Sequence, residues 1–288
     1  MNGLRSQVAV PISKTHLRDV EDGIANDVVS RIEESVDWLQ QAPQRELSQL
    51  GHGLSCSDVE TTPAISVVIP VFNECNTVAQ VIERVVSLEI EKQIILVDDG
   101  STDGTQRILS TYIGQKGFEV ILHPHNQGKG AALKSGFQRA QGEIVIVQDA
   151  DLEYDPQDIL NVVAPILEGR CDVVYGSRYL ANSVQDPSFI HRLGNWLLTQ
   201  FSNWMTSNRL TDMETCYKAI RRDILQSIDI EQRRFGFEPE ITAKLARRGH
   251  RILEVPISYR SRSWKDGKKI GIKDLINTLW CIVRYRFS

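Results

Sequence analysis

Residues 144–158 read IVIVQDADLEYDPQD. The four apolar residues 144–147 predict a buried strand, because a short apolar run bounded by turn residues is typical of one. Carboxylates follow this strand directly, at Asp149, Asp151, Glu153, Asp155 and Asp158. Since burying unpaired charge is costly, this acidic segment either lies in a solvated turn or faces a cation.

Apolar runs of the same kind recur along the chain and alternate with helical patterns. The predicted strands are 65–69, 94–97, 119–122, 144–147 and 173–175. The predicted helices are 78–86, 105–113, 130–140 and 156–167, followed by an amphipathic helix over 189–205. Strands that are apolar throughout and alternate with helices predict an α/β fold, in which helices flank both faces of a mostly parallel sheet.

Polar loops follow four successive predicted strands. They read PVFNE, DDGSTDGT, HPHNQGKG and QDADLEYDP. Ligands of parallel sheets bind beyond the carboxyl ends of the strands. The four loops therefore predict a binding site along one edge of the sheet.

Composition excludes several classes of protein. The 288 residues are 41% hydrophobic, which is enough for a sizeable core. No stretch approaches twenty apolar residues, and the N-terminus lacks a basic start followed by an apolar run, so we expect neither a transmembrane helix nor a signal peptide. Five scattered cysteines without a C-x-x-C pair argue for a reducing compartment and against a zinc site or a disulfide framework.

Charge and composition divide the chain into three segments. These are an extension with one amphipathic helix and a linker (1–62), the main domain (63–258), and a basic loop with an amphipathic helix (259–288). Residues 1–64 carry five Lys and Arg against ten Asp and Glu, whereas residues 241–288 carry twelve against three. The basic tail predicts an anionic partner, with phosphate, an acidic membrane surface and nucleic acid as candidates.

Two of the loops have features of nucleotide binding. Asp98 and Asp99 stand back to back at a strand end and suit hydrogen bonds to base or ribose donors; alternatively the loop is a turn in which Ser101 or Asp103 caps the next helix. Lys129 lies between two glycines that open a helix, which can bring donors and a cation to a phosphate. Neither the P-loop nor the dinucleotide-binding fingerprint is matched, so a plain glycine turn with a surface lysine is the alternative.

Asp149 and Asp151 are two residues apart where a strand ends. Such a pair can hold one divalent cation, because Mg²⁺ or Mn²⁺ takes few carboxylates and completes its shell with phosphate oxygens and water. That cation would neutralise charge on a diphosphate leaving group. The alternative is a solvated acidic turn before the next helix.

Together, and in this order, the motifs resemble the family-2 glycosyltransferases with the GT-A fold (nucleotide-diphospho-sugar transferase, Rossmann-like). Within that family the chain is most similar to the polyprenyl-phosphate (dolichol-phosphate) sugar synthase branch, which serves cell-envelope glycan biosynthesis. The resemblance covers roughly residues 65–287. The stretches that carry it are SVVIPVFNE, ILVDDGSTDGT, HNQGKGAALKSGFQRAQGEIVIVQDADLEYDP, VVYGSRY, TDMETCYKAIRRDIL and FGFEPEITAKLARRGHRILEVPISYRSRSWKDGKKIG.

The resemblance implies a role for each donor-side residue. Pro70, Phe72 and Glu74 match the loop that wraps the nucleotide base, with Phe72 in place of the common Tyr. Asp98 and Asp99 match the base-and-ribose carboxylates.

Near the reacting groups, Lys129 matches the glycine-flanked lysine beside the donor. Asp149 and Asp151 match the metal-binding pair, and Glu153 stands beside the metal and the sugar.

On the acceptor side, Arg178 and Arg192 match arginines that bind the acceptor phosphate, and Asp212 lies near the acceptor in the family. An alternative for Arg192 is a surface charge on a helix. Glu238 falls near the general base of relatives that glycosylate hydroxyls, but it can equally serve the first turn of a helix that begins near Pro239.

The expected function is an inverting, metal-dependent transfer of a sugar from a UDP- or GDP-sugar to a polyprenyl phosphate. Such a phosphate is already an anionic nucleophile and needs positioning rather than a strong base. One alternative keeps the donor but glycosylates a hydroxyl, with Glu238 as base. Another is a non-catalytic scaffold that binds nucleotide sugars. A sugar nucleotidyltransferase is disfavoured because PVFNE stands where a Gly-rich, Arg-containing loop is needed.

The tail suggests where the protein acts. Basic residues precede an apolar face that contains Ile276, Leu279, Trp280 and Val283, a pattern that can lie on an anionic membrane. We therefore expect a cytoplasmic protein with peripheral contact at the inner face of the membrane and no nucleic-acid partner, with a homodimer as a candidate assembly.

Overall fold

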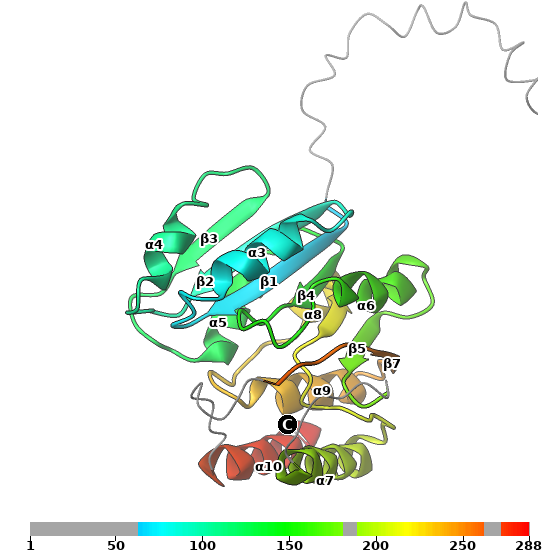
Figure 1. Ribbon diagram of the computed structural model, residues 1–288. Coiled ribbons are helices and arrows are strands. Elements are labelled where there is room, and N and C mark those ends of the chain that lie inside the picture. The colour runs from blue at the N-terminus through cyan, green and yellow to red at the C-terminus, as the bar shows by residue number, and fades with distance from the viewer. Residues whose placement is uncertain (1–62, 181–188, 262–271, 288) are drawn as a thin grey trace, which may run out of the picture. The chain divides into compact units, whose positions relative to one another are not determined.

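A computed structural model describes residues 63–180, 189–261 and 272–287 (Figure 1). The helix expected in the N-terminal extension and most of the basic loop before residue 272 lie outside the described residues. All described residues belong to one compact unit, Thr61–Ser288.

The centre of this unit is a seven-stranded sheet with the strand order β3-β2-β1-β4-β6-β5-β7. Its strands are β1 (Ile65–Val71), β2 (Lys92–Asp98), β3 (Phe118–Leu122), β4 (Ile144–Val147), β5 (Val173–Ser177), β6 (Lys218–Arg221) and β7 (Ile252–Pro256). β6 runs antiparallel to β4 and β5, and every other neighbouring pair is parallel. The predicted mostly parallel sheet is therefore confirmed, and all five predicted strands are present.

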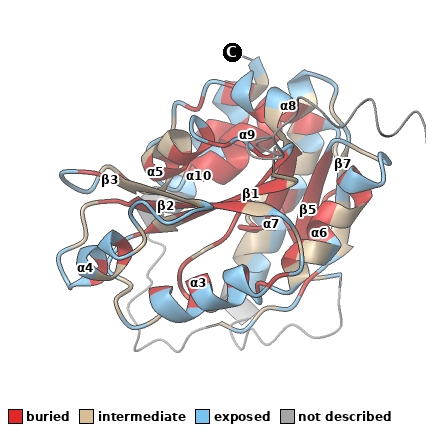
Figure 2. Ribbon diagram, turned by 90° about the horizontal axis from the view of Figure 1, so that it is seen from above, coloured by how far each residue is buried: buried red, intermediate tan, exposed pale blue. Residues whose placement is uncertain are grey.

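Helices flank this sheet. They are α3 (Val78–Val86), α4 (Thr105–Ser110), α5 (Lys129–Phe137), α6 (Asp158–Leu167), α7 (Phe189–Thr206), α8 (Arg222–Gln226), α9 (Phe237–Arg247) and α10 (Ile272–Phe287). In Figure 2, α3 lies on one side of β1, and α5 and α9 lie on the other. The architecture is the GT-A arrangement that the sequence predicted.

Three helices differ from their predicted ranges by two or more residues at one end, whereas α7 is longer than predicted by a single residue. α4 ends at Ser110 rather than 113, because residues 111–114 form a turn that closes at Gly114 with a left-handed backbone (φ 77°). α5 covers 129–137 rather than 130–140, and α6 begins at 158 rather than 156. The segment before α6 is a turn in which Asp155 Oδ1 accepts a hydrogen bond from Gln157 N at 3.1 Å.

α7, α9 and α10 pack together beside the sheet (Figure 1). Cys281, Ile282 and Tyr285 form the buried face of α10. Within the described part of the chain, no helix is both long and apolar enough to cross a membrane.

Candidate active site

The loops after β1 and β2 are joined by hydrogen bonds at the carboxyl edge of the sheet. Asn73 has a left-handed backbone (φ 55°). Its N–H donates to Ser101 Oγ at 2.9 Å, and its Oδ1 accepts from Thr102 N at 2.9 Å. The amide of Cys75 donates to Asp103 Oδ2 at 3.1 Å. These bonds hold the two loops in one layer.

Asp103 and Ser101, which the sequence offered as helix caps, are used differently. The N-cap of α4 is Gly104, which has a left-handed backbone. Asp103 precedes it and accepts hydrogen bonds from the amide and hydroxyl of Thr105, at 3.0 and 2.6 Å. Desolvation favours the neutral acid, but hydrogen bonds from Thr105 outweigh it and hold the pKa of Asp103 well below its usual range. Asp103 is thus a structural residue of the loop.

Three predicted base-binding residues lie at the end of β1 and in the loop after it. Phe72 is 45% exposed, so its ring is accessible for stacking. Pro70 is half-buried within β1. Glu74 accepts a hydrogen bond from Thr77 Oγ1 at 2.7 Å.

Asp98 is buried at the end of β2 and has two different carboxylate oxygens. Its Oδ2 accepts hydrogen bonds from the backbone amides of Gly100 and Ser101, at 3.2 and 3.1 Å. Its Oδ1 is buried and has no hydrogen-bond partner among the described residues. A buried acceptor without a donor is costly, so this oxygen is an exception to the usual pairing of buried polar groups.

Asp99, in contrast, is engaged by the protein itself. Its Oδ1 lies 2.9 Å from His123 Nδ1 and accepts from Gln127 N at 2.9 Å. Its Oδ2 accepts from Gly128 N at 2.7 Å. The other ring nitrogen of His123 lies 3.0 Å from Ser135 Oγ. Asp99 therefore ties the end of β2 to the loop that carries Lys129, a role that the sequence did not reveal.

Lys129 opens α5 and joins two predicted site residues. Its Nζ lies 2.9 Å from Asp149 Oδ1 and 3.2 Å from Glu238 Oε1. Burial disfavours the charged amine, but the neighbouring carboxylates of Asp149 and Glu238 outweigh it and hold the pKa of Lys129 well above its usual value. The structure thus brings together residues from α5, the end of β4 and the first turn of α9.

The chain bends sharply between Asp151 and Glu153, in the loop after β4. Leu152 has a left-handed backbone (φ 60°), which costs a non-glycine residue about 1 kcal/mol. The bend allows Glu153 N to donate to Asp151 Oδ1 at 3.2 Å. Glu153 Oε2 accepts from Tyr259 Oη at 2.9 Å. These hydrogen bonds fix Asp151 and Glu153, which are both buried, with 6% and 5% of their surface exposed.

The carboxylates match the donor set of a divalent cation only in part. Among the described residues, no three His, Cys, Asp or Glu side chains are grouped closely enough to hold a metal ion. The predicted set of Asp149, Asp151 and Glu153 is therefore not assembled as a cluster. Mg²⁺ often takes only one or two carboxylates and relies on substrate phosphates for the rest. Asp149 and Asp151 fit that partial role.

On the predicted acceptor side, Arg178 is held by Asp212. Its Nε donates to Asp212 Oδ2 and its Nη2 to Asp212 Oδ1, both at 2.7 Å. Asn195 of α7 donates to the same Oδ1 at 3.2 Å. Arg192 lies about one turn before Asn195, on an exposed part of α7. Among the described residues, contacts to Asp212 thus fix Arg178.

Sequence reasoning missed two charged residues near this site, the half-buried Glu214 and the buried Lys218. Glu214 Oε1 is buried without a hydrogen-bond partner in the described part of the chain. Burial, and then the charge of Glu238, raises the pKa of Glu214. Lys218 Nζ donates to the carbonyl oxygens of Met213 and Thr215 at 2.8 and 2.6 Å. A Glu and a Lys four residues apart in the otherwise buried stretch METCYK were the available signal.

Comparison with known proteins agrees with this geometry. Residues 66–229 match the family described as Glycosyl transferase family 2. Undecaprenyl-phosphate 4-deoxy-4-formamido-L-arabinose transferase of Proteus mirabilis is 32% identical over 230 residues, covering 78% of this chain and 68% of that protein. Dodecaprenyl-phosphate galacturonate synthase of Rhizobium johnstonii is 29% identical over 204 residues, covering 69% of this chain and 59% of that protein.

Solved structures share the fold at lower sequence identity. Glucosyl-3-phosphoglycerate synthase from Mycobacterium tuberculosis, solved with Mn²⁺, UDP and glucosyl-3-phosphoglycerate, has a TM-score of 0.59 and 20% identity, covering 78% of this chain and 80% of that one. Mannosyl-3-phosphoglycerate synthase from Rubrobacter xylanophilus has a TM-score of 0.61 and 20% identity, covering 77% and 72%.

Proposed function

This chain belongs to glycosyl transferase family 2, and we propose that it moves a sugar from a UDP- or GDP-sugar to a polyprenyl phosphate, with inversion at the anomeric carbon and with Mg²⁺ or Mn²⁺ as cofactor. The observation that carries the proposal is the meeting of Lys129, Asp149 and Glu238 where α5, β4 and α9 converge. The similarity to two polyprenyl-phosphate sugar transferases supports the choice of acceptor.

The nucleotide would lie along the loops after β1 and β2. Asp98 Oδ1 is a buried acceptor that a base N–H or a ribose hydroxyl would satisfy. The exposed ring of Phe72 offers a stacking surface for the base, in the loop that also holds Pro70 and Glu74. Asp99 acts indirectly, because its oxygens already hold His123 and the glycine-lysine loop.

A divalent cation would be held by Asp149 and Asp151, with Glu153 beside them. When bound, it would neutralise negative charge on the diphosphate leaving group. Lys129 contributes a second positive charge at the same place, because its ammonium group lies against Asp149. Tyr259 orients Glu153 through the hydrogen bond from its hydroxyl group.

The acceptor phosphate would approach Arg178 and Arg192. A phosphate monoester carries its own nucleophilic oxygen anion, so the protein has to position it and neutralise its charge. Asp212 fixes the guanidinium plane of Arg178 through two hydrogen bonds, which prepares it for a second anion. A hydroxyl acceptor with Glu238 as base is less favoured, because Glu238 is already paired with Lys129.

Contact with a membrane is proposed from the outer faces of α7 and α10. Large apolar side chains are exposed along both helices: Leu193, Trp196, Leu197, Trp204, Leu275, Ile276, Leu279, Trp280, Val283 and Phe287. The sequence of α7 contains no acidic residue, and α10 ends with Arg284 and Arg286. Exposed tryptophans beside basic residues are typical of a surface that lies in an anionic lipid interface.

A transfer assay tests the proposed function. Purified protein would be incubated with Mg²⁺ or Mn²⁺, a panel of radiolabelled UDP- and GDP-sugars and a short polyprenyl phosphate. We expect label from one donor to move into the organic phase, and we expect Asp151→Asn to abolish this transfer while retaining part of the nucleotide binding. Donor hydrolysis without lipid labelling would contradict the polyprenyl acceptor and favour a hydroxyl acceptor.

A further inference from the structure

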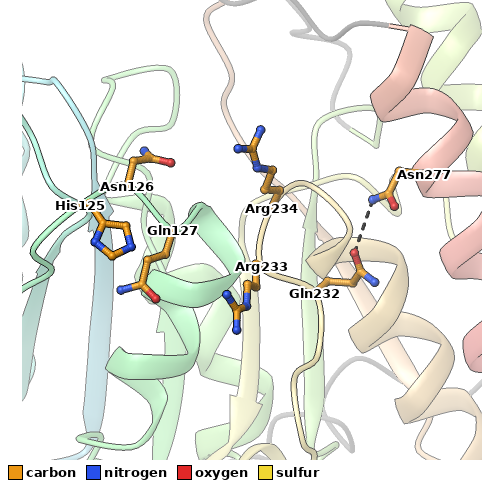
Figure 3. A pocket seen from close by; sticks show the side chains of 7 residues that line it. All are labelled: His125, Asn126, Gln127, Gln232, Arg233, Arg234 and Asn277. Atoms are coloured by element: carbon orange, nitrogen blue, oxygen red, sulfur yellow. Dashed lines mark hydrogen bonds between the residues drawn. The ribbon is translucent and has the colours of Figure 1, made fainter.

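A cavity of about 570 Å³ lies between the loop after β3 and the segment that precedes α9 (Figure 3). His125, Asn126 and Gln127 line it on one side, and Arg233 and Arg234 on the other. No lining residue carries a carboxylate, and two are arginines. This composition favours an anion.

The backbone that presents the two arginines is anchored. The carboxylate of Glu240 accepts hydrogen bonds from the amides of Glu231 and Gln232, both at 2.8 Å. The carbonyl of Arg233 accepts from Ala131 N at 3.0 Å. Anchoring from α9 and from α5 fixes the cavity wall before any ligand arrives.

Glycines make this close packing possible. A Cβ on Gly128 would collide with the carbonyl oxygen of Arg233, and a Cβ on Gly130 would collide with that of Gln232. The two glycines beside Lys129 therefore allow the cavity wall to approach α5. Glycine is therefore needed at both positions for packing, whether or not the loop also binds a phosphate.

The side chains of Arg233 and Arg234 are exposed and form no hydrogen bond or ion pair within the described parts of the chain. Arg178, Arg221 and Arg284 each contact a carboxylate instead. Figure 3 shows the side chains of Arg233 and Arg234 extending in opposite directions along the cavity wall, so each guanidinium group can donate charge-assisted hydrogen bonds to a different part of an anionic ligand.

We propose that this cavity is a phosphate-binding site separate from the proposed donor and acceptor sites. Lys129 Nζ is directed at Asp149 and Glu238, and none of these three residues lines the cavity. The phosphate group has two sources, a soluble phosphorylated compound and the headgroup of an anionic lipid. Asn277 of α10 lines the cavity and neighbours the exposed Ile276, which places a lipid surface within reach.

Calorimetric titration of the full-length protein with inorganic pyrophosphate tests the site without an activity measurement. We expect R233A/R234A to weaken pyrophosphate binding by about tenfold or more, the effect of losing charge-assisted hydrogen bonds. R247A/R251A is the matched control, because it removes two exposed arginines outside the cavity and changes net charge equally. R233K/R234K should recover part of the affinity, since lysine keeps the charge but not the planar donor geometry.

Two further arms identify the source of the phosphate. If it is a lipid headgroup, pyrophosphate will release the protein from phosphatidylglycerol vesicles, and R233A/R234A will sediment less with them. If it is soluble, vesicle binding will be unchanged in both tests. Equal pyrophosphate affinity in the wild-type protein and R233A/R234A would overturn the proposal, as would loss of UDP binding in that variant, which would assign the arginines to the donor site.

Discussion

Lys129 Nζ lies 2.9 Å from Asp149 Oδ1 and so joins the first residue of α5 to the loop that follows β4. The same ammonium group lies 3.2 Å from Glu238 Oε1 on α9. One lysine thus separates two carboxylates that would otherwise repel each other.

Replacing Lys129 by methionine should therefore destabilise the fold. We expect a loss of about 2 to 4 kcal/mol, between the values for exposed and fully buried ion pairs. Urea unfolding at neutral pH, where the raised pKa of Lys129 keeps its ammonium group charged, measures this loss. A loss below about 1 kcal/mol, the range of exposed ion pairs, would contradict the prediction, and Lys129→Arg serves as the charge-preserving control.

Replacing Asp98 by asparagine and replacing Asp99 by asparagine should have different effects on stability and on nucleotide binding. Asp99→Asn replaces one acceptor by a donor where three N–H groups converge, and should cost about 1 to 3 kcal/mol of stability. In Asp98→Asn, the amide oxygen can replace Oδ2, which accepts the backbone hydrogen bonds, and the NH₂ group then replaces the unpaired Oδ1. This variant should therefore weaken nucleotide binding with little change in stability. Thermal unfolding and UDP or GDP titration of both variants compare them. Equal stability losses would contradict the assigned roles.

The exposed apolar side chains of α7 and α10 predict that the protein binds anionic vesicles through these two helices. Replacing Trp196 and Trp204 by serine should weaken sedimentation with phosphatidylglycerol vesicles by about tenfold or more, since insertion energy scales with apolar area. Ile113→Ser, which removes an exposed apolar side chain after α4, should have no effect. Light scattering provides the second readout, because a dimer that becomes a monomer in the tryptophan variant would show that this face binds a second copy instead.

Glu214 predicts a pH dependence of stability. Its folded pKa is raised by burial, so between its ordinary value of 4.5 and the raised value the folded state holds a proton that the unfolded state has lost. Stability should therefore fall as the pH rises through this window. Glu214→Gln should remove this part of the slope, and denaturant midpoints measured across the window test the difference. An unchanged slope would contradict a raised pKa.

The sequence predicted the strands whose apolar runs are uninterrupted, such as 65–69 and 144–147, and the loops that follow them. It did not predict β6 and β7. β6 begins with a lysine and ends with an arginine, although Lys218 is buried under Tyr175. β7 lies at the sheet edge and contains half-buried and exposed residues but no buried one, so neither strand has the apolar signature of a buried parallel strand.

Within the site, residue types could be predicted but contacts could not. β3 and β4, the strands that precede Lys129 and Asp149, are separated in the sheet by β2 and β1. Lys129 reaches Asp149 because α5 packs against β1, the neighbour of β4, and the sequence did not imply this. The bond between Asp99 and the glycine-lysine loop, and the one between Arg178 and Asp212, join segments about thirty residues apart. Such pairs depend on how the loops close, which no local pattern encodes.

Two neighbouring residues of α7 point in different directions. Asn195 reaches inward to Asp212, while Trp196, the next residue, points away from the core with 54% of its surface exposed. A surface or partner bound at Trp196 would therefore lie one residue away from the side chain that contacts Asp212, the carboxylate that orients Arg178. Binding on the outside of α7 would then also set the position of Arg178.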